Sequence, residues 1–292
     1  MAKFAVAVEV KNPRLQSRAL EHHGSFLYLT GDVAGSLEAF RRSAEVDSSN
    51  AKCWIKKGSI LFDVGRRDEA FECFTAAQSI APLDADLYLH KGQGHLIANE
   101  FRSAVRDLQR SVELRDTLPI AWAAWGVALF RLAMADGQPS PHLISKCLAV
   151  MEDALQRFPE SCEVLLFFAE ILVGLGDFAR ALSLLRQSSS LEPDCPLPYV
   201  NAARAYLGMN DLLAARRHLE RGQELDPEYP GAFMDMGQLL MQEGRPAEAL
   251  TMYVRGIERA RFPSEIHEAM SSHEVAKCHL EAQRLLHQEV AF

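Results

Sequence analysis

One pattern, the length of two short helices, recurs seven times along the 292-residue chain and limits the fold more than any other feature of the sequence. Taken as units of 34 residues, the copies begin near Ser17, Ala51, Ala85, Pro119, Cys162, Pro196 and Pro230. The interval is 34 residues except between the fourth and fifth copies, where it is 43. Because so short a unit cannot bury its apolar face alone, we expect the copies to stack along the chain.

Each copy combines large and small residues in a fixed order. The clearest copy contains Trp54, Gly58, Ala70, Phe74 and Pro82. Gly and Ala let the two helices of a unit approach closely, the large anchors fill the space between neighbouring units, and the proline ends the second helix. This order resembles the tetratricopeptide repeat, or TPR. The resemblance implies an all-α fold, a right-handed TPR solenoid of about seven helix pairs plus a C-terminal capping helix.

The repeats predict three parts of the chain. Residues 1–16 are expected to form an irregular leader, residues 17–263 the seven repeats, and residues 264–292 a capping helix and tail. The fourth repeat carries an inserted loop near residues 134–142, where Gly137 and Pro139 disfavour helix and Ser140-Pro141 suits the start of the next one. The insertion is either a tolerated surface loop or a lip over a binding groove.

The charge and apolar content of the chain exclude several classes of partner. The net charge is −8 and no basic run stands out, whereas nucleic-acid affinity rests on clustered Lys and Arg. No run of eighteen uncharged apolar residues predicts a membrane span, and Glu9 and Lys11 interrupt the start too early for a signal peptide. The cysteines form no C-x-x-C pair, which is typical of reduced thiols. With no membrane anchor in its sequence, the chain is expected to be soluble and cytoplasmic if it is complete.

The sequence contains no catalytic signature, so we predict that the chain is not an enzyme and needs no cofactor. Neither G-x-S-x-G, H-E-x-x-H, a P-loop nor a dinucleotide-binding fingerprint occurs. Four histidines follow the last repeat, at spacings that do not bring metal ligands to one helical face: His267, His273, His279 and His287. We therefore predict no metal site.

In TPR arrays the inner surface is lined mainly by positions 2, 5, 9 and 12 of each first helix, and this resemblance predicts a mostly apolar groove. The groove residues expected from these positions are Phe62, Leu89, Leu96, Val127, Phe130, Glu163, Leu166, Glu170, Val173, Val200, Arg204, Leu207, Met234 and Met241. An exposed apolar stripe normally marks a binding site. The alternative is that the superhelix closes and buries these residues against one another. Because Glu163 and Glu170 share a helical face with Leu166 and Val173, we expect an amphipathic segment with apolar and basic residues to bind there.

Chaperone-docking TPR domains hold an acidic chaperone tail with Lys, Asn and Arg side chains at defined inner positions. The corresponding positions of this chain hold Glu21, Ser25, Lys56, Asp86 and His90. The carboxylates of such a tail would lack their basic partners. We therefore predict no docking of a chaperone C-terminal tail through this chain.

Several segments resemble the C-terminal half of the seventy-kilodalton mitochondrial import receptor family. They are residues 84–93 (DADLYLHKGQ), 157–163 (RFPESCE), 167–172 (FFAEIL) and 191–194 (LEPD), together with the elongated fourth repeat and the long closing helix. The resemblance covers roughly residues 50 to 285. It implies a groove that receives mitochondrial precursor proteins, notably carrier proteins, at the cytosolic face of the outer membrane, with other translocase subunits as further partners. Glu163 closes RFPESCE and is the acidic groove position that the resemblance carries over.

We therefore expect a protein-binding module that holds hydrophobic or amphipathic precursor segments in its groove. The family's membrane anchor and chaperone clamp precede these repeats and do not occur in this chain. A structural TPR scaffold that holds a permanent partner in a multiprotein assembly is the alternative. An enzyme carrying TPR repeats is a third possibility, and it would require a catalytic domain outside this chain.

Overall fold

The computed structural model describes residues 12–135, 137–260 and 263–289. All regular secondary structure in these residues is α-helical, in fifteen helices. The chain divides into two compact units, with the boundary between Thr117 and Leu118. The all-α TPR solenoid expected from the repeats is confirmed.

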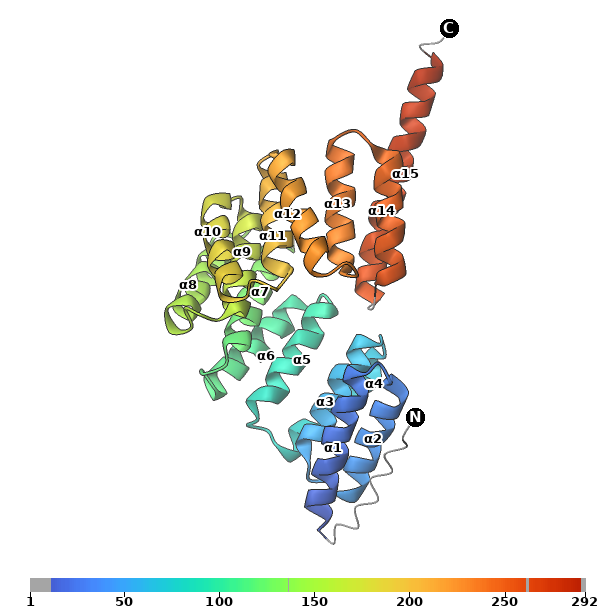
Figure 1. Cartoon of the computed structure of the whole chain (residues 1–292). Helices are drawn as coiled ribbons and strands as arrows, with labels where there is room; N and C mark the ends of the chain where they lie inside the picture. The colour runs from blue at the N-terminus through green and yellow to red at the C-terminus, as the bar shows by residue number, and fades with distance from the viewer. Residues whose placement is uncertain (1–11, 136, 261–262, 290–292) are drawn as a thin grey trace. The chain divides into compact units, whose positions relative to one another are not determined.

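Unit 1 contains three helix pairs, each made of a first and a second helix that lie side by side (Figure 1). The helices are α1 (Pro13–Leu29), α2 (Val33–Val46), α3 (Ala51–Asp63), α4 (Arg67–Ile80), α5 (Ala85–Ile97) and α6 (Phe101–Leu114). Consecutive first helices also pack on one another, α1 on α3 and α3 on α5.

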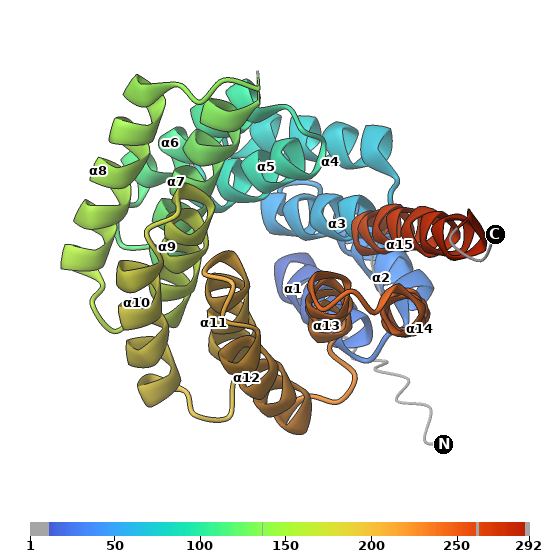
Figure 2. The same cartoon turned by 90° about the horizontal axis from the view of Figure 1, so that it is seen from above.

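Unit 2 contains four helix pairs and a closing helix. The helices are α7 (Pro119–Met134), α8 (Pro141–Arg157), α9 (Cys162–Leu175), α10 (Phe178–Leu191), α11 (Leu197–Gly208), α12 (Leu212–Leu225), α13 (Pro230–Gln242), α14 (Pro246–Arg259) and α15 (Pro263–Glu289). The first helices α7, α9, α11 and α13 pack in succession and form what we call the inner layer of unit 2. The second helices α8, α10, α12 and α14 form its outer layer (Figure 2).

Each helix pair is held together by a small residue of the first helix that faces a large side chain of the second. A Cβ added to Gly58 would lie 2.7 Å from the ring of Phe74, and one added to Gly237 would lie 2.4 Å from the ring of Tyr253. Phe74 is fully buried, as are the small residues Ala70 and Ala77 beside it on α4. Since protein interiors are close-packed, a larger residue at the small position would push the two helices apart.

The turn inside a pair depends on a residue with left-handed backbone. Gly31, Gly65, Gly176 and Gly244 have φ between 74° and 87° at the same repeat position, and Asn99 and Asn210 have φ of 58° and 60° there. Glycine adopts this conformation without steric cost, and asparagine is one of the few other residues that tolerate it. Gly and Asn recur at this turn position in the sequence, and this recurrence is a further signal of the repeat.

The nine extra residues of the fourth pair are spread over three places. Helix α7 has 16 residues where α3, α5 and α13 have 13, and α8 has 17 where the other second helices have 14. Met134 and Pro141-His142 are therefore helical, so both ends of the expected loop at 134–142 belong to the flanking helices. Helix breakers in the sequence locate the centre of the insertion, but they do not show that the flanking helices lengthen. Pro141 begins α8 after Ser140, as predicted.

The two ends of the repeat array differ from the expected boundaries by a few residues. Helix α1 begins at Pro13, because Asn12 Oδ1 accepts a hydrogen bond from the backbone N–H of Arg14 and caps the helix. The rest of the predicted leader, residues 1–11, lies outside the described residues. At the other end α15 packs on α13 and α14 and buries Ala269 and Ala276, as a capping helix does. The last residues of the predicted tail, 290–292, also lie outside the described part.

Polar groups are partly buried between the first helices of unit 1. The hydroxyl of Tyr28 donates to the Asp63 carboxylate at 2.5 Å, and burial raises the pKa of Asp63. The next first helix contributes His90, whose pKa is lowered by burial despite the nearby carboxylates of Asp86 and Asp63. Folding of unit 1 therefore disfavours the protonated form of His90.

Replacing Gly58 by valine should destabilise unit 1 by about 1–3 kcal/mol, because the added side chain collides with Phe74. The measurement is urea unfolding followed by circular dichroism. The matched control is Ser59→Val, which adds a β-branched residue at the neighbouring, partly exposed position of the same helix. Equal losses in the two variants would mean that helix propensity, and not the Gly58–Phe74 contact, sets the effect.

The lowered pKa of His90 predicts that the stability of unit 1 falls as the pH is reduced below about 6.5, the ordinary pKa of histidine. In that window the unfolded chain binds a proton that the folded chain resists, so protonation favours unfolding. His90→Gln should reduce this pH dependence of the unfolding midpoint, whereas His22→Gln, which removes an exposed imidazole of the same unit, should not. Identical pH profiles for wild type and His90→Gln would contradict the prediction.

Candidate partner-binding surface

Four of the predicted groove residues are core residues. Phe62 and Leu89 are buried in unit 1, and Val200 and Leu207 are buried in unit 2. Phe62 packs its ring on Phe71 and Phe74, with centroids 5.0 and 5.9 Å away. We therefore remove these four residues from the proposed binding surface.

Large apolar residues at repeat positions 5 and 12 pack against neighbouring helices, whether they are buried or partly exposed. Position 5 faces the second helix of its own pair: a Cβ added to Gly222 of α12 would lie 2.8 Å from Val200, and one added to Gly256 of α14 would lie 3.1 Å from Met234. Position 12 faces the next first helix: Phe62 lies beside Gly94, and Phe130 lies beside Gly174. A large apolar residue at either position therefore has a structural use even when no partner is bound.

What remains accessible in unit 2 is a set of partly exposed apolar side chains on the inner layer. The set comprises Val127, Phe130, Leu166, Val173, Met234 and Met241. In unit 1 only Leu96 of the predicted apolar residues stays partly exposed. We call the six residues of unit 2, together with the charges described next, the inner surface of unit 2.

A row of alternating charges crosses the four helices of the inner layer, with one residue from each helix. Arg131 of α7 lies 3.8 Å from Glu170 of α9, and Nε of Arg204 on α11 donates to Asp235 of α13 at 2.7 Å. The Glu170 carboxylate also interacts electrostatically with Arg204, which links the two ion pairs. Nη1 of Arg204 lies 3.3 Å from the side-chain oxygen of Asn201. We name Arg131, Glu170, Arg204 and Asp235 the charge row.

The two ends of the charge row differ in exposure. The Asp235 side chain is 8% exposed, whereas Glu170 is 41% and Arg131 56% exposed. Burial alone would lower the pKa of Arg204, but the carboxylates of Asp235 and Glu170 outweigh it and the net pKa shift is upward. Arg204 therefore stays charged and compensates Asp235, while Glu170 keeps carboxylate surface available to a partner. The sequence predicted Glu170 and Arg204 as groove residues but gave no reason to pair them with Arg131 and Asp235.

Glu163 has a second use besides the predicted one. Its Oε2 accepts a hydrogen bond from the hydroxyl of Ser161 at 2.7 Å, and Ser161 is the N-cap of α9. A carboxylate in the first turn of a helix is stabilised by the helix dipole. Glu163 is exposed, so it remains at the edge of the inner surface of unit 2.

The residues of unit 1 at the chaperone-clamp positions are polar, and several of them already pair with one another or with neighbouring side chains. The Lys56 ammonium lies 2.9 Å from the buried Glu21 carboxylate and donates to the Ser25 hydroxyl at 3.1 Å. Asp86 forms an ion pair with Arg115. Lys56, the one basic residue at the clamp positions, therefore has its charge compensated within unit 1, which supports the prediction that no acidic chaperone tail docks there.

Among the described residues, no three His, Cys, Asp or Glu side chains gather as metal ligands would. None of the described helices is both long and apolar enough to cross a lipid bilayer.

Comparisons with known proteins agree with the repeat pattern. Models of the tetratricopeptide repeat match residues 51–82, 172–228 and 206–272. The human mitochondrial import receptor subunit TOM70 is 24% identical over 258 residues, which cover 87% of this chain and 42% of that protein. TOM70 of Saccharomyces cerevisiae is 26% identical over 268 residues, covering 89% of this chain and again 42% of the relative. The chain thus spans less than half the length of these relatives.

The solved structures extend the likeness to the fold. The crystal structure of yeast Tom70 matches 96% of this chain and 58% of its own, with a TM-score of 0.66 and 23% identity. A TPR protein from Parabacteroides merdae matches 89% of this chain and 99% of its own, with a TM-score of 0.68 and 14% identity. The Cut9–Hcn1 structure of the APC/C matches 93% of this chain and 56% of its own, at 0.61 and 14%. By its repeat matches and its fold the chain is a TPR solenoid, and its sequence is similar to that of TOM70.

Proposed function

We propose that the inner surface of unit 2 binds hydrophobic or amphipathic segments of mitochondrial precursor proteins. The observation that carries this proposal is the set of partly exposed apolar side chains on three of the four inner helices of unit 2, α7, α9 and α13. Similarity to import receptor subunits supports precursors as the class of partner. The same similarity supports a position at the cytosolic face of the mitochondrial outer membrane.

The apolar part of the surface supplies affinity. Each square ångström of apolar surface removed from water stabilises a complex by about 25 cal/mol before the costs of association. Val127 and Val173 lie at inner positions of adjacent helices α7 and α9, where a bound segment can cover both. The two methionines of α13, Met234 and Met241, add flexible side chains that adapt to different apolar partners.

The charge row supplies selectivity. Glu170 can accept hydrogen bonds from Lys or Arg side chains of the segment, while Arg131 and Arg204 repel those that approach elsewhere along the row. A segment with an apolar face and one basic residue near Glu170 satisfies both features.

A scaffold that holds a permanent partner is the second candidate, because the same fold occurs in the Cut9–Hcn1 structure of the APC/C. The two functions differ in how the partner leaves. A precursor must be released, so its segments should exchange rapidly and compete with one another. A permanent partner should instead co-purify in stoichiometric amount and resist competition by precursor segments.

The double variant Val127→Glu, Val173→Glu should weaken the binding of labelled segments from carrier-type precursors by about tenfold or more, because it places carboxylates on the apolar part of the surface. Binding is measured by fluorescence anisotropy. The control is Leu213→Glu, at an exposed apolar residue of the outer layer, which should bind like wild type. Equal affinity of the double variant and wild type, with helicity unchanged, would overturn the proposed surface.

Glu170→Gln should weaken segments that carry a basic residue by about two- to fivefold, since Glu170 is 41% exposed and exposed ion pairs contribute little. The same segments with glutamine in place of the basic residue should bind wild type and Glu170→Gln equally. A loss of the same size for both kinds of segment would show that Glu170 acts through the fold and does not recognise the partner's charge.

A further inference from the structure

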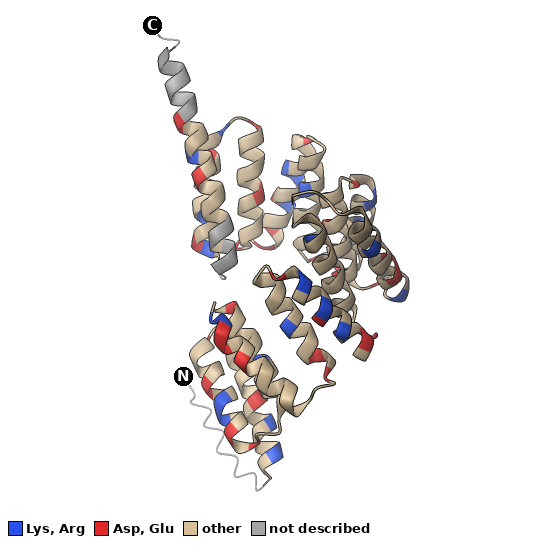
Figure 3. Ribbon diagram, turned by 180° about the vertical axis from the view of Figure 1, so that it is seen from behind, with Lys and Arg blue, Asp and Glu red and all other residues tan. Residues whose placement is uncertain are grey.

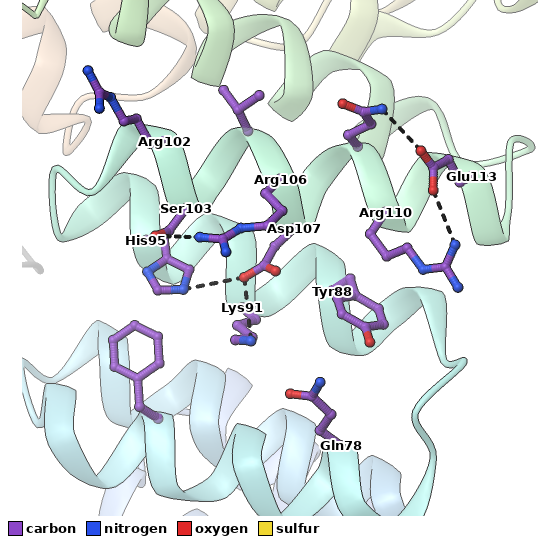
Figure 4. A pocket seen from close by; sticks show the side chains of 13 residues that line it. Gln78, Tyr88, Lys91, His95, Arg102, Ser103, Arg106, Asp107, Arg110 and Glu113 are labelled. Atoms are coloured by element: carbon purple, nitrogen blue, oxygen red, sulfur yellow. Dashed lines mark hydrogen bonds and ion pairs between the residues drawn. The ribbon is translucent and has the colours of Figure 1, made fainter.

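A second surface, wholly within unit 1, has the opposite character to the inner surface of unit 2. Helices α4 and α6 both pack on α5 and hardly on each other, which leaves a hollow of about 840 Å³ between them. This volume lies in the range of ligand-binding cavities. Side chains of α6 line one wall, Gln78 of α4 lies opposite, and Tyr88, Lys91 and His95 of α5 lie between them (Figure 4).

The charges around the hollow are mostly positive. Lys91, Arg102, Arg106 and Arg110 line it, against the carboxylates of Asp107 and Glu113 only. The arginines of α6 gather visibly beside Lys91 of α5 (Figure 3). Because the whole chain carries a net charge of −8, this local excess is a departure from the rest of the protein.

The two carboxylates of the hollow already have partners. Asp107 is buried, and its Oδ2 lies 3.6 Å from the Lys91 ammonium and 3.3 Å from His95 Nε2. Glu113 lies 3.1 Å from Arg110 Nη1. Lys91 and Arg110 are therefore compensated, and neither carboxylate neutralises the remaining arginines.

Arg102 and Arg106 are the cations without a carboxylate partner. Both are exposed, and among the described residues neither forms an ion pair; Arg106 donates only to the Ser103 hydroxyl, at 3.3 Å. They stand four residues apart on α6, about 6 Å along the helix axis. Arg110 continues the same face one turn further.

This geometry fits one kind of partner. On a helix, carboxylates at every fourth position repeat with the same spacing of about 6 Å, so they can meet successive arginines of α6. The wall of α4 contributes Phe71 and Gln78 and no charge, and Phe71 and Tyr88 each offer ring surface for an apolar side chain, about two helical turns apart along α5. We propose that the hollow between α4 and α6 binds an acidic amphipathic helix of a partner protein, with its carboxylates on Arg102 and Arg106 and an apolar residue against Phe71 or Tyr88.

The proposed site is separate from the precursor-binding surface. It uses the second helices α4 and α6 of unit 1, and it selects acidic segments where the inner surface of unit 2 selects basic ones. A chain with both sites could hold a cargo segment and an acidic partner at once. Failure of either proposal leaves the other intact, because no residue is common to the two.

The test uses the full chain and a fluorescein-labelled synthetic helix with glutamate at every fourth position and one leucine on the same face. A twin peptide has glutamine in place of each glutamate. Wild type should bind the glutamate peptide at least about tenfold more tightly than its twin, and added salt should weaken that binding. Equal binding of the two peptides, or no binding of the glutamate peptide, would overturn the proposal.

The variant Arg102→Glu, Arg106→Glu should lose at least about tenfold in affinity for the glutamate peptide. The matched control is Arg217→Glu, Arg255→Glu, which makes the same change in charge at exposed positions of α12 and α14 and should bind like wild type. Equal losses in the two double variants would mean that overall charge, and not this hollow, attracts the peptide. Crosslinks from a benzophenone beside the peptide leucine should map to Phe71 or Tyr88, and crosslinks confined to unit 2 would also refute the site.

Discussion

The fold depends on the contact between a small residue of each first helix and a large side chain of the second. Gly58 against Phe74 and Gly237 against Tyr253 bring the two helices so close that no Cβ fits between them. This contact fixes the pair as a unit, and the left-handed Gly or Asn at the turn returns the chain at the right place. Stacking then follows, because each pair still has apolar side chains that only a neighbouring pair can cover.

The sequence predicts this level of structure well and the insertion less well. All seven predicted repeat starts coincide with the first residue of a helix or lie within four residues of it, and Ser140-Pro141 marks the start of α8. Because the same spaced residues recur in every pair, the helix boundaries of one copy can be checked against the others. The insertion of the fourth pair occurs in no other copy, so its boundaries cannot be checked in this way. Its extra residues lengthen two helices, which the helix breakers at the centre of the insertion do not indicate.

The binding surface is predicted less completely, for a physical reason. Apolar residues serve both the core and a partner, and residue type alone does not distinguish Val200, which is buried, from Val173, which is partly exposed. Pairing across helices is equally hidden: Arg131 and Glu170 stand 39 positions apart, and only the packing of α7 on α9 brings them to 3.8 Å. The paired polar residues of unit 1 and its basic hollow likewise bring together residues from different helices, so they too are hard to recognise in the sequence.

The charge row has a mechanical consequence for unit 2. A solenoid bends by small rotations between successive pairs, and a bond between neighbouring inner helices resists such a rotation. Arg131–Glu170 ties α7 to α9, and Arg204–Asp235 ties α11 to α13. The first tie is exposed and weakened by salt, whereas the second is largely buried and screened much less. Raising the ionic strength should therefore loosen the contact between α7 and α9 more than the contact between α11 and α13.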